Sequence, residues 1–163
     1  MLYFSLSHNA RASALVVTVV KATGLMTDGD APVAAESLNA YVKVRLLLPA
    51  ADKQVHQKAK TKVVRRSANP VFDETFTFAG VDSGRLQKRG SALHVSVLNS
   101  DTFSRDTLLG ELVYSLDETD LHTEDTVNLT RPLTRGNNKV IFAFNYHRQI
   151  PFSASVLYAY RVV

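Results

Sequence analysis

The chain contains no cysteine, which excludes a disulfide framework and any metal site built on thiolates. It also has no run approaching the roughly 18 to 20 consecutive apolar residues that a membrane-spanning helix needs. The first methionine leads directly into a strand-like segment, 2–6, without the charged leader of a secretion signal. These absences fit a cytosolic protein, and we expect the chain to be a short form or a domain of something longer.

Helix signals are scarce as well. Residues 83–89 and 116–121 could each form about one turn, but neither has two periods of apolar spacing, so both are interpreted as connectors. Elsewhere the hydrophobic pattern has a period of two, in short runs rich in Val, Leu, Phe, Tyr and Thr. The predicted strands are residues 2–6, 14–22, 41–48, 59–64, 73–78, 92–98, 108–116 and 126–129. Eight strands at this spacing predict an all-β fold, an antiparallel sandwich of two sheets.

The length of 163 residues, with 45% hydrophobic residues, allows one sizeable core. We assign this core to residues 1–136. Beyond Gly136 the composition changes to an aromatic segment, 137–163, which we interpret as a divergent C-terminal tail that packs poorly. The longest irregular stretch, 24–38, is rich in Gly, Asp, Ala and Pro, and loops of this length in a compact sandwich tend to be functional or mobile.

Acidic residues are nearly missing from one segment. The whole chain has 19 Lys and Arg against 15 Asp and Glu, a formal net charge of +4. Residues 41–66 alone contain eight Lys and Arg against a single carboxylate, Asp52, which gives this segment +7 and leaves −3 for the rest. A local basic patch on a mildly acidic body predicts an anionic partner held at one place, rather than a uniform nucleic-acid coat.

The basic residues of this segment recur at alternate positions. Residues two apart in a strand point to the same side, so each of two predicted strands would carry one row. The rows are Tyr41, Lys43 and Arg45, followed by Lys58, Lys60 and Lys62. If the strands pair as a hairpin, the rows form one basic surface. The alternative is a solvated face whose Lys residues protect a sheet edge, but the scarcity of acidic residues favours binding of a lipid headgroup.

Signals for catalysis are absent. The five histidines are scattered without zinc-ligand spacing, and no phosphate-binding glycine loop or nucleophile elbow occurs. We therefore predict that the chain is not an enzyme. Nucleic-acid binding is the next alternative, since Tyr41 could stack a base above a basic face. The aromatics of segment 72–78 fall at alternating core positions and RNA-binding signatures are missing, so we expect no nucleic-acid partner.

Five blocks of the chain form a recognisable series. They are 14–25 (ALVVTVVKATGL), 41–44 (YVKV), 60–63 (KTKV), 69–78 (NPVFDETFTF) and 109–111 (LGE). In order and spacing they resemble the C2 domain family, most closely the first C2 domain of the synaptotagmins. The resemblance covers residues 2–136 and does not extend to the tail. It implies an eight-stranded C2-type sandwich whose loops at one end hold calcium between Asp side chains and then dock on anionic phospholipid.

The resemblance also implies a depleted calcium site. Asn39 stands where the family has an Asp, and Asn99 and Thr107 stand at two Asp positions of a later loop. The residues that remain for a weak site are Asp28, Asp30, Asn39, Asn99, Asp101 and Asp106. Each missing carboxylate removes negative charge that would face a divalent ion, so affinity should fall steeply. The alternative is that these aspartates are ordinary turn residues. We expect that no cofactor is required and that any calcium binding is weak.

The family's phosphoinositide site uses a Tyr and a Lys on one strand and two Lys on the next, and the resemblance matches these to Tyr41, Lys43, Lys60 and Lys62. Near an anionic leaflet each Lys or Arg contributes about 1 kcal/mol, so four would suffice for weak, reversible attachment. We therefore expect a peripheral module on the cytoplasmic face of vesicle or plasma membranes, which binds anionic phospholipid and takes part in vesicle trafficking.

A loop residue could add to this attachment. Phe103, close to Arg105, lies where the family has a membrane-inserting side chain, and burial of its ring in the bilayer would add about 1.5 to 3 kcal/mol. Two further functions stay open. One is a calcium-dependent sensor for exocytosis, and the other is a protein-interaction module for acidic membrane-fusion (SNARE) proteins or for another C2 domain.

Overall fold

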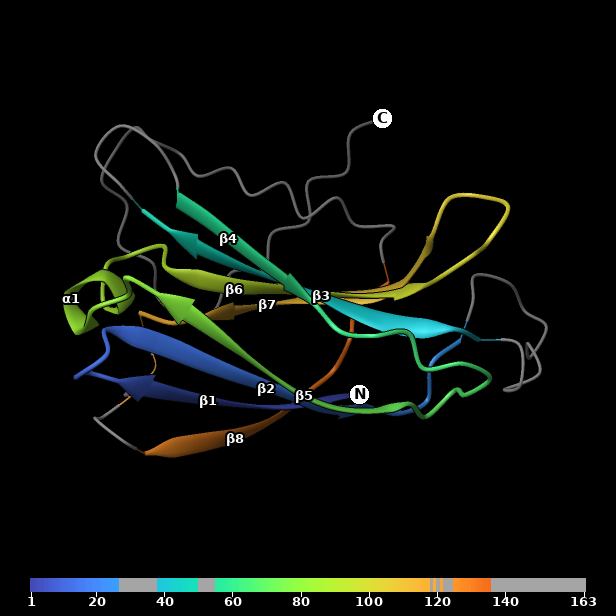
Figure 1. The fold of residues 1–163 in the computed structure, drawn as a ribbon, viewed down its shortest axis with the longest axis horizontal. Coiled ribbons are helices and arrows are strands. Elements are labelled where there is room, and N and C mark those ends of the chain that lie inside the picture. Colours follow the sequence, from blue (N-terminus) through green and yellow to red (C-terminus); the bar gives the residue numbers. More distant parts are fainter. Residues whose placement is uncertain (27–37, 50–54, 118, 120, 122–124, 136–163) are drawn as a thin grey trace.

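The chain folds into two four-stranded antiparallel sheets that face each other (Figure 1). The computed structural model describes residues 1–26, 38–49, 55–117, 119, 121 and 125–135. The strand order is β5-β2-β1-β8 in one sheet and β4-β3-β6-β7 in the other. The elements are β1 (Leu2–Asn9), β2 (Ala14–Ala22), β3 (Ala40–Leu48), β4 (Val55–Lys60), β5 (Val71–Ala79), α1 (Ser83–Leu86), β6 (Ala92–Asn99), β7 (Thr107–Ser115) and β8 (Thr126–Arg131). The predicted eight-stranded antiparallel sandwich is confirmed.

Strand β3 illustrates how the sequence builds the core. Val42, Val44 and Leu46 are fully buried between the sheets, and burial of such a side chain contributes about 1.5 to 3 kcal/mol. Because side chains alternate along a strand, the residues between them face outward. Lys43 is half-buried there and Arg45 is exposed. The apolar stripe therefore fixes the side of the sheet on which the basic residues lie.

The end of β4 differs from the prediction. The predicted strand 59–64 is wrong at both ends, since β4 runs over Val55–Lys60. Thr61 still contacts β3 through two hydrogen bonds of 2.9 Å. Its backbone N–H donates to the Val42 carbonyl, and its side-chain Oγ1 accepts from the Val42 N–H. Val64 then bridges Ala40 instead of following the Lys43–Lys60 register, which leaves one extra residue in between. This irregularity, typical of a bulge, ends the regular ladder.

Different connecting segments lie at the two ends of the sandwich. The short helix α1 lies at one end, and the loops 61–70 and 100–106 lie at the other (Figure 1). Segment 83–89 thus contains one helical turn, whereas the described residues of 116–121 form no helix. No helix within the described part of the chain has both the length and the apolar character needed to cross a membrane. The tail, 137–163, and most of the loop 24–38 lie outside the described residues.

Candidate functional site

Four basic side chains of β3 and β4 form two directly opposed pairs. The antiparallel register places Lys43 opposite Lys60 and Arg45 opposite Lys58. With the backbone between them, these residues line a shallow depression of about 430 Å³ on the β4-β3-β6-β7 sheet. We call these four residues the basic groove. The hairpin pairing on which the predicted basic surface depended is therefore present.

The basic groove has no carboxylate partner in the described part of the chain. No Asp or Glu among those residues comes within ion-pair distance of the four cations. Like charges placed directly opposite each other on a sheet repel and destabilise it. The groove is therefore a cluster of positive charge that an external anion would stabilise.

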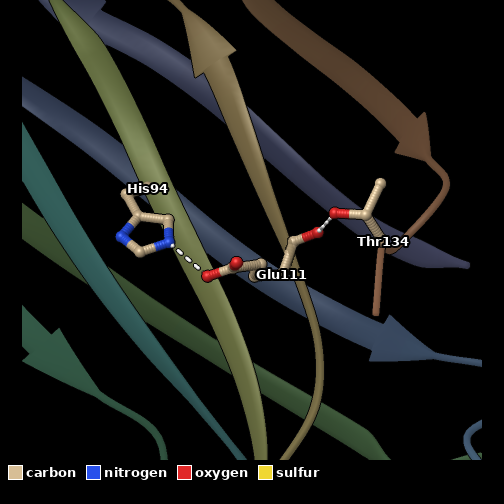
Figure 2. A network of polar contacts seen from close by, with 3 residues as sticks. All are labelled: His94, Glu111 and Thr134. Atoms are coloured by element: carbon tan, nitrogen blue, oxygen red, sulfur yellow. Dashed lines mark hydrogen bonds and ion pairs between the residues drawn. The ribbon is translucent and has the colours of Figure 1, made fainter. Parts of the chain in front are cut away.

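A second polar group flanks the groove on β6 and β7. His94, which pairs with Arg45 in the register, has its Nε2 2.9 Å from Glu111 Oε2 (Figure 2). Two backbone hydrogen bonds of 2.8 Å join Glu111 to Thr134. The Thr134 hydroxyl also donates a hydrogen bond of 2.9 Å to the Glu111 carbonyl. Ser96 lies between Lys43 and Glu111 in the register. The Glu111 carboxylate therefore points to His94 and not to the groove. No pattern in the sequence predicts this pairing.

Tyr41 lies at the loop end of the groove. Its side chain is buried, with Lys43 Nζ 5.3 Å from the centroid of its ring, a distance typical of a cation–π contact. Its hydroxyl donates a hydrogen bond of 2.5 Å to Asp106 Oδ2. Burial raises the pKa of Tyr41, and the bond to Asp106 raises it further. Tyr41 therefore links the basic groove to the loop 100–106.

The same contacts act on Asp106 in the opposite direction. The Tyr41 hydroxyl is the main reason that the pKa of Asp106 is lowered from its usual value. A hydrogen bond from the Asp101 N–H, at 3.4 Å, also lowers it, as do the positive charges of Lys43 and Lys60. The ionised carboxylate of Asp106 thus stands in the electric field of the groove.

Lys62 lies outside this arrangement. It follows the end of β4 at Lys60, so it does not belong to the opposed pairs, and its place in the lipid-binding surface stays a prediction. Its backbone N–H donates to Glu74 Oε1 at 2.7 Å, which ties this segment to β5 of the opposite sheet. Lys62 is exposed and is not among the residues that line the groove.

The carboxylate of Asp101 accepts hydrogen bonds from residues of its own loop. Its Oδ1 accepts from the N–H groups of Phe103 and Ser104, at 2.8 and 3.3 Å, and its Oδ2 accepts from Ser104 Oγ at 2.7 Å. The bond from the Ser104 hydroxyl is the largest of the effects that lower the pKa of Asp101. This pattern matches the turn-residue alternative of the sequence. Phe103 at the loop tip is 98% exposed, and Arg105 is exposed too.

The two asparagines of the candidate calcium site meet between β3 and β6. Asn99 Oδ1 accepts from the Asn39 N–H, and the Asn39 carbonyl accepts from the Ser100 N–H, both at 2.8 Å. Asp28 and Asp30 lie outside the described residues. Among the residues that are described, no group of three or more His, Cys, Asp or Glu side chains could hold a metal ion.

Comparison with known proteins identifies the fold family. The family model of the C2 domain matches residues 13–133. Synaptotagmin-11 of Rattus norvegicus is 39% identical over 137 residues, which are 83% of this chain and 29% of that protein. Synaptotagmin-4 of Homo sapiens is 33% identical over 136 residues, again 83% of this chain and 29% of the relative. The chain therefore spans less than a third of these curated relatives.

Solved structures agree with the sequence comparisons. A C2 domain of RIM from Drosophila superposes with a TM-score of 0.61 at 28% identity, covering 79% of this chain and 96% of the other. The third C2 domain of KIAA1228 protein superposes with a TM-score of 0.64 at 25% identity, covering 83% and 88%. None of these matches indicates an enzymatic family. The chain belongs to the C2 domain family and is similar to the C2 domains of synaptotagmins and RIM.

Proposed function

We propose that this chain is a non-enzymatic C2 module that binds anionic phospholipid, in particular a phosphoinositide headgroup, through the basic groove. The main support is the opposed pairing of Lys43 with Lys60 and of Arg45 with Lys58. Edge protection could explain Lys58 and Lys60, because β4 is an edge strand. It does not explain Lys43 and Arg45, since β3 is paired on both sides.

The energetics of the groove suit reversible attachment. Four cations near an anionic leaflet would contribute about 4 kcal/mol in total. Phe103, 98% exposed at a loop tip, is available for insertion into the bilayer. The human phosphatidylinositol 4-phosphate 3-kinase C2 domain-containing subunit beta is 35% identical over 122 residues, which are 7% of its length. Its name refers to a phosphoinositide on which that kinase acts, and this is consistent with the proposed class of ligand.

The proposal includes weak or no dependence on calcium. Asp101 and Asp106 direct their carboxylates to hydrogen bonds within the domain. Asn99 likewise uses its side-chain oxygen on a backbone N–H. A calcium ion would have to displace several of these bonds, and it would gain fewer negative charges than a site built of Asp alone offers.

Vesicle binding tests the function. Vesicles with and without phosphatidylinositol 4,5-bisphosphate would be sedimented with the wild type and with Lys43→Ala combined with Lys60→Ala, in calcium and in chelator. We expect wild-type binding to require the phosphoinositide, to persist in chelator and to weaken at least tenfold in the double variant, because two cations contribute about 2 kcal/mol. Equal binding by both proteins would exclude the groove, and binding only with calcium would favour the sensor alternative.

The wider role proposed is peripheral membrane trafficking at the cytoplasmic face of vesicles or the plasma membrane. Its support is the similarity to synaptotagmin and RIM C2 domains. A SNARE protein or a second C2 domain could meet the same groove, because an acidic protein and an anionic membrane satisfy the same charges. Retention of a SNARE complex at physiological salt, lost on charge reversal of Lys43 and Lys60 but insensitive to phosphoinositide vesicles, would favour that protein-interaction alternative.

A further inference from the structure

We propose that Asp106 competes with the phosphate ligand for the Tyr41 hydroxyl at the loop end of the basic groove. Because the Asp106 carboxylate already accepts the hydrogen bond of this hydroxyl, it limits the affinity of the groove for phosphate. The inference rests on the proposed function and adds to it a residue that opposes binding. The sequence placed Asp106 only among candidate calcium ligands, whereas the structure turns its carboxylate toward Tyr41.

The geometry brings Asp106 and Lys43 to the same side chain. Asp106 Oδ2 lies 2.5 Å from the Tyr41 hydroxyl, while Lys43 Nζ lies 5.3 Å from the centroid of the Tyr41 ring. Lys43 faces Lys60 directly across the ladder. A phosphate held between these two lysines would therefore be close to both the Tyr41 hydroxyl and the Asp106 carboxylate.

The chemistry of the hydroxyl makes the two anions rivals. A tyrosine hydroxyl has a single proton to donate, and in the structure it is donated to Asp106. A phosphate oxygen could take that bond only by displacing the carboxylate, and without displacement it would be repelled by the negative charge. Asp106 is exposed, so no burial prevents its displacement. The influence of Lys43 and Lys60 on the ionisation of Asp106 supports the view that all these charges interact.

Isothermal titration of the whole chain with soluble inositol 1,4,5-trisphosphate provides the test. Asp106→Asn keeps the size of the side chain and removes its charge. We expect the affinity to rise about fivefold, which corresponds to about 1 kcal/mol, the size of a contact between unit charges at about 4 Å in water. The gain should shrink in high salt, because exposed charges are screened. Vesicles containing phosphatidylinositol 4,5-bisphosphate should show the same order of affinities, and inorganic phosphate alone would tell headgroup binding from simple phosphate binding.

Asp73→Asn is the matched control. Asp73 is exposed on β5 of the other sheet with a φ of 47°, a conformation that Asn accepts readily. This variant changes the net charge by the same amount and should leave the affinity within twofold. An unchanged or reduced affinity of Asp106→Asn, in a protein whose thermal unfolding is normal, would overturn the inference. So would an equal gain in the control.

The same titrations separate the inference from the proposed function. If the wild type binds and the combined Lys43 and Lys60 variant does not, the function stands, and Asp106→Asn alone decides the inference. If neither the wild type nor Asp106→Asn binds inositol trisphosphate or the vesicles, both are overturned. Binding by Asp106→Asn where the wild type is too weak to measure would support both.

Discussion

The hydrogen bond between Tyr41 and Asp106 favours the neutral form of the tyrosine and the ionised form of the aspartate. The phenol is kept neutral by burial and by its bond to the carboxylate, and the carboxylate is kept ionised by the same bond. This mutual effect makes the hydrogen bond most favourable in the pH range where Asp106 is charged and Tyr41 is not. At the scale of single residues, the attachment of the loop 100–106 to β3 should therefore depend on pH.

The expected pH dependence follows from the direction of each change. The pKa of Asp106 is lowered in the folded state, so its contribution is present above the unfolded value of about 3.9 and is lost as the pH falls through the folded value. The pKa of Tyr41 is raised, so its contribution is present below about 10 and is lost at higher pH. Tyr41→Phe removes the bond and should unfold at a lower temperature than the wild type at neutral pH.

The measurement is thermal unfolding of both proteins at successive pH values. The difference in melting temperature should narrow as the pH falls below about 4. Tyr3→Phe removes a hydroxyl on β1 of the other sheet, from a ring that contacts Lys21 and no carboxylate of the described residues, and it serves as the matched control. A difference that stays constant down to about pH 2.5 would show that Asp106 does not use Tyr41 as its partner.

At the scale of elements, β7 depends on a close contact with the segment after β8. Glu111 and Thr134 form an isolated antiparallel bridge, which covers part of the open edge of β7. Gly110, the preceding residue of β7, is buried, and a Cβ placed on it would lie 2.8 Å from Leu133 Cβ. Such a separation is too short for two carbon atoms, so the bridge requires glycine at this position.

Gly110→Ala should therefore destabilise the domain. Overpacking of this kind costs about 1 to 3 kcal/mol, and each kcal/mol lowers the melting temperature of a domain of this size by about 2 to 4 °C. Thermal unfolding by circular dichroism would measure the change. Val113→Ala, which trims an exposed side chain of the same strand, should have a smaller effect. A melting temperature unchanged by Gly110→Ala would mean that the segment 133–134 does not pack against β7 in solution.

The strands were predictable where alternation is regular and less so where the ladder shifts. Residues 14–22 were predicted with the observed bounds of β2 because the apolar stripe is continuous there. The end of β4 was misplaced because Lys60, Lys62 and Val64 keep an alternating pattern through an irregularity of pairing. Spacing within a strand gives the face of each side chain but not the register between strands. The charged rows could be predicted for this reason, whereas the contacts of Tyr41 with Asp106 and of His94 with Glu111 could not.

At the scale of the whole molecule, one row of residues across each sheet shows a difference in charge. Across the β5-β2-β1-β8 sheet the register aligns Thr75, Thr18, Ser5 and Asn128, a row without charge. Across the other sheet it aligns Lys58, Arg45 and His94. An anionic membrane should therefore be attracted to the face that carries the basic groove. Phe103 lies in the loop 100–106, which joins β6 to β7 of the same sheet, so a headgroup in the groove and a ring in the bilayer would be two contributions that experiments can separate.

Substitution of Phe103 separates these two contributions. Phe103→Ser should weaken binding to vesicles that contain phosphatidylinositol 4,5-bisphosphate by about tenfold or more, because insertion of the ring contributes about 1.5 to 3 kcal/mol. Affinity for soluble inositol trisphosphate should not change, since the soluble ligand offers no apolar phase. Phe103→Leu keeps most of the apolar surface and should retain most of the vesicle binding. Equal vesicle binding by Phe103→Ser and the wild type would mean that the loop stays in water, and the groove alone would then have to account for membrane attachment.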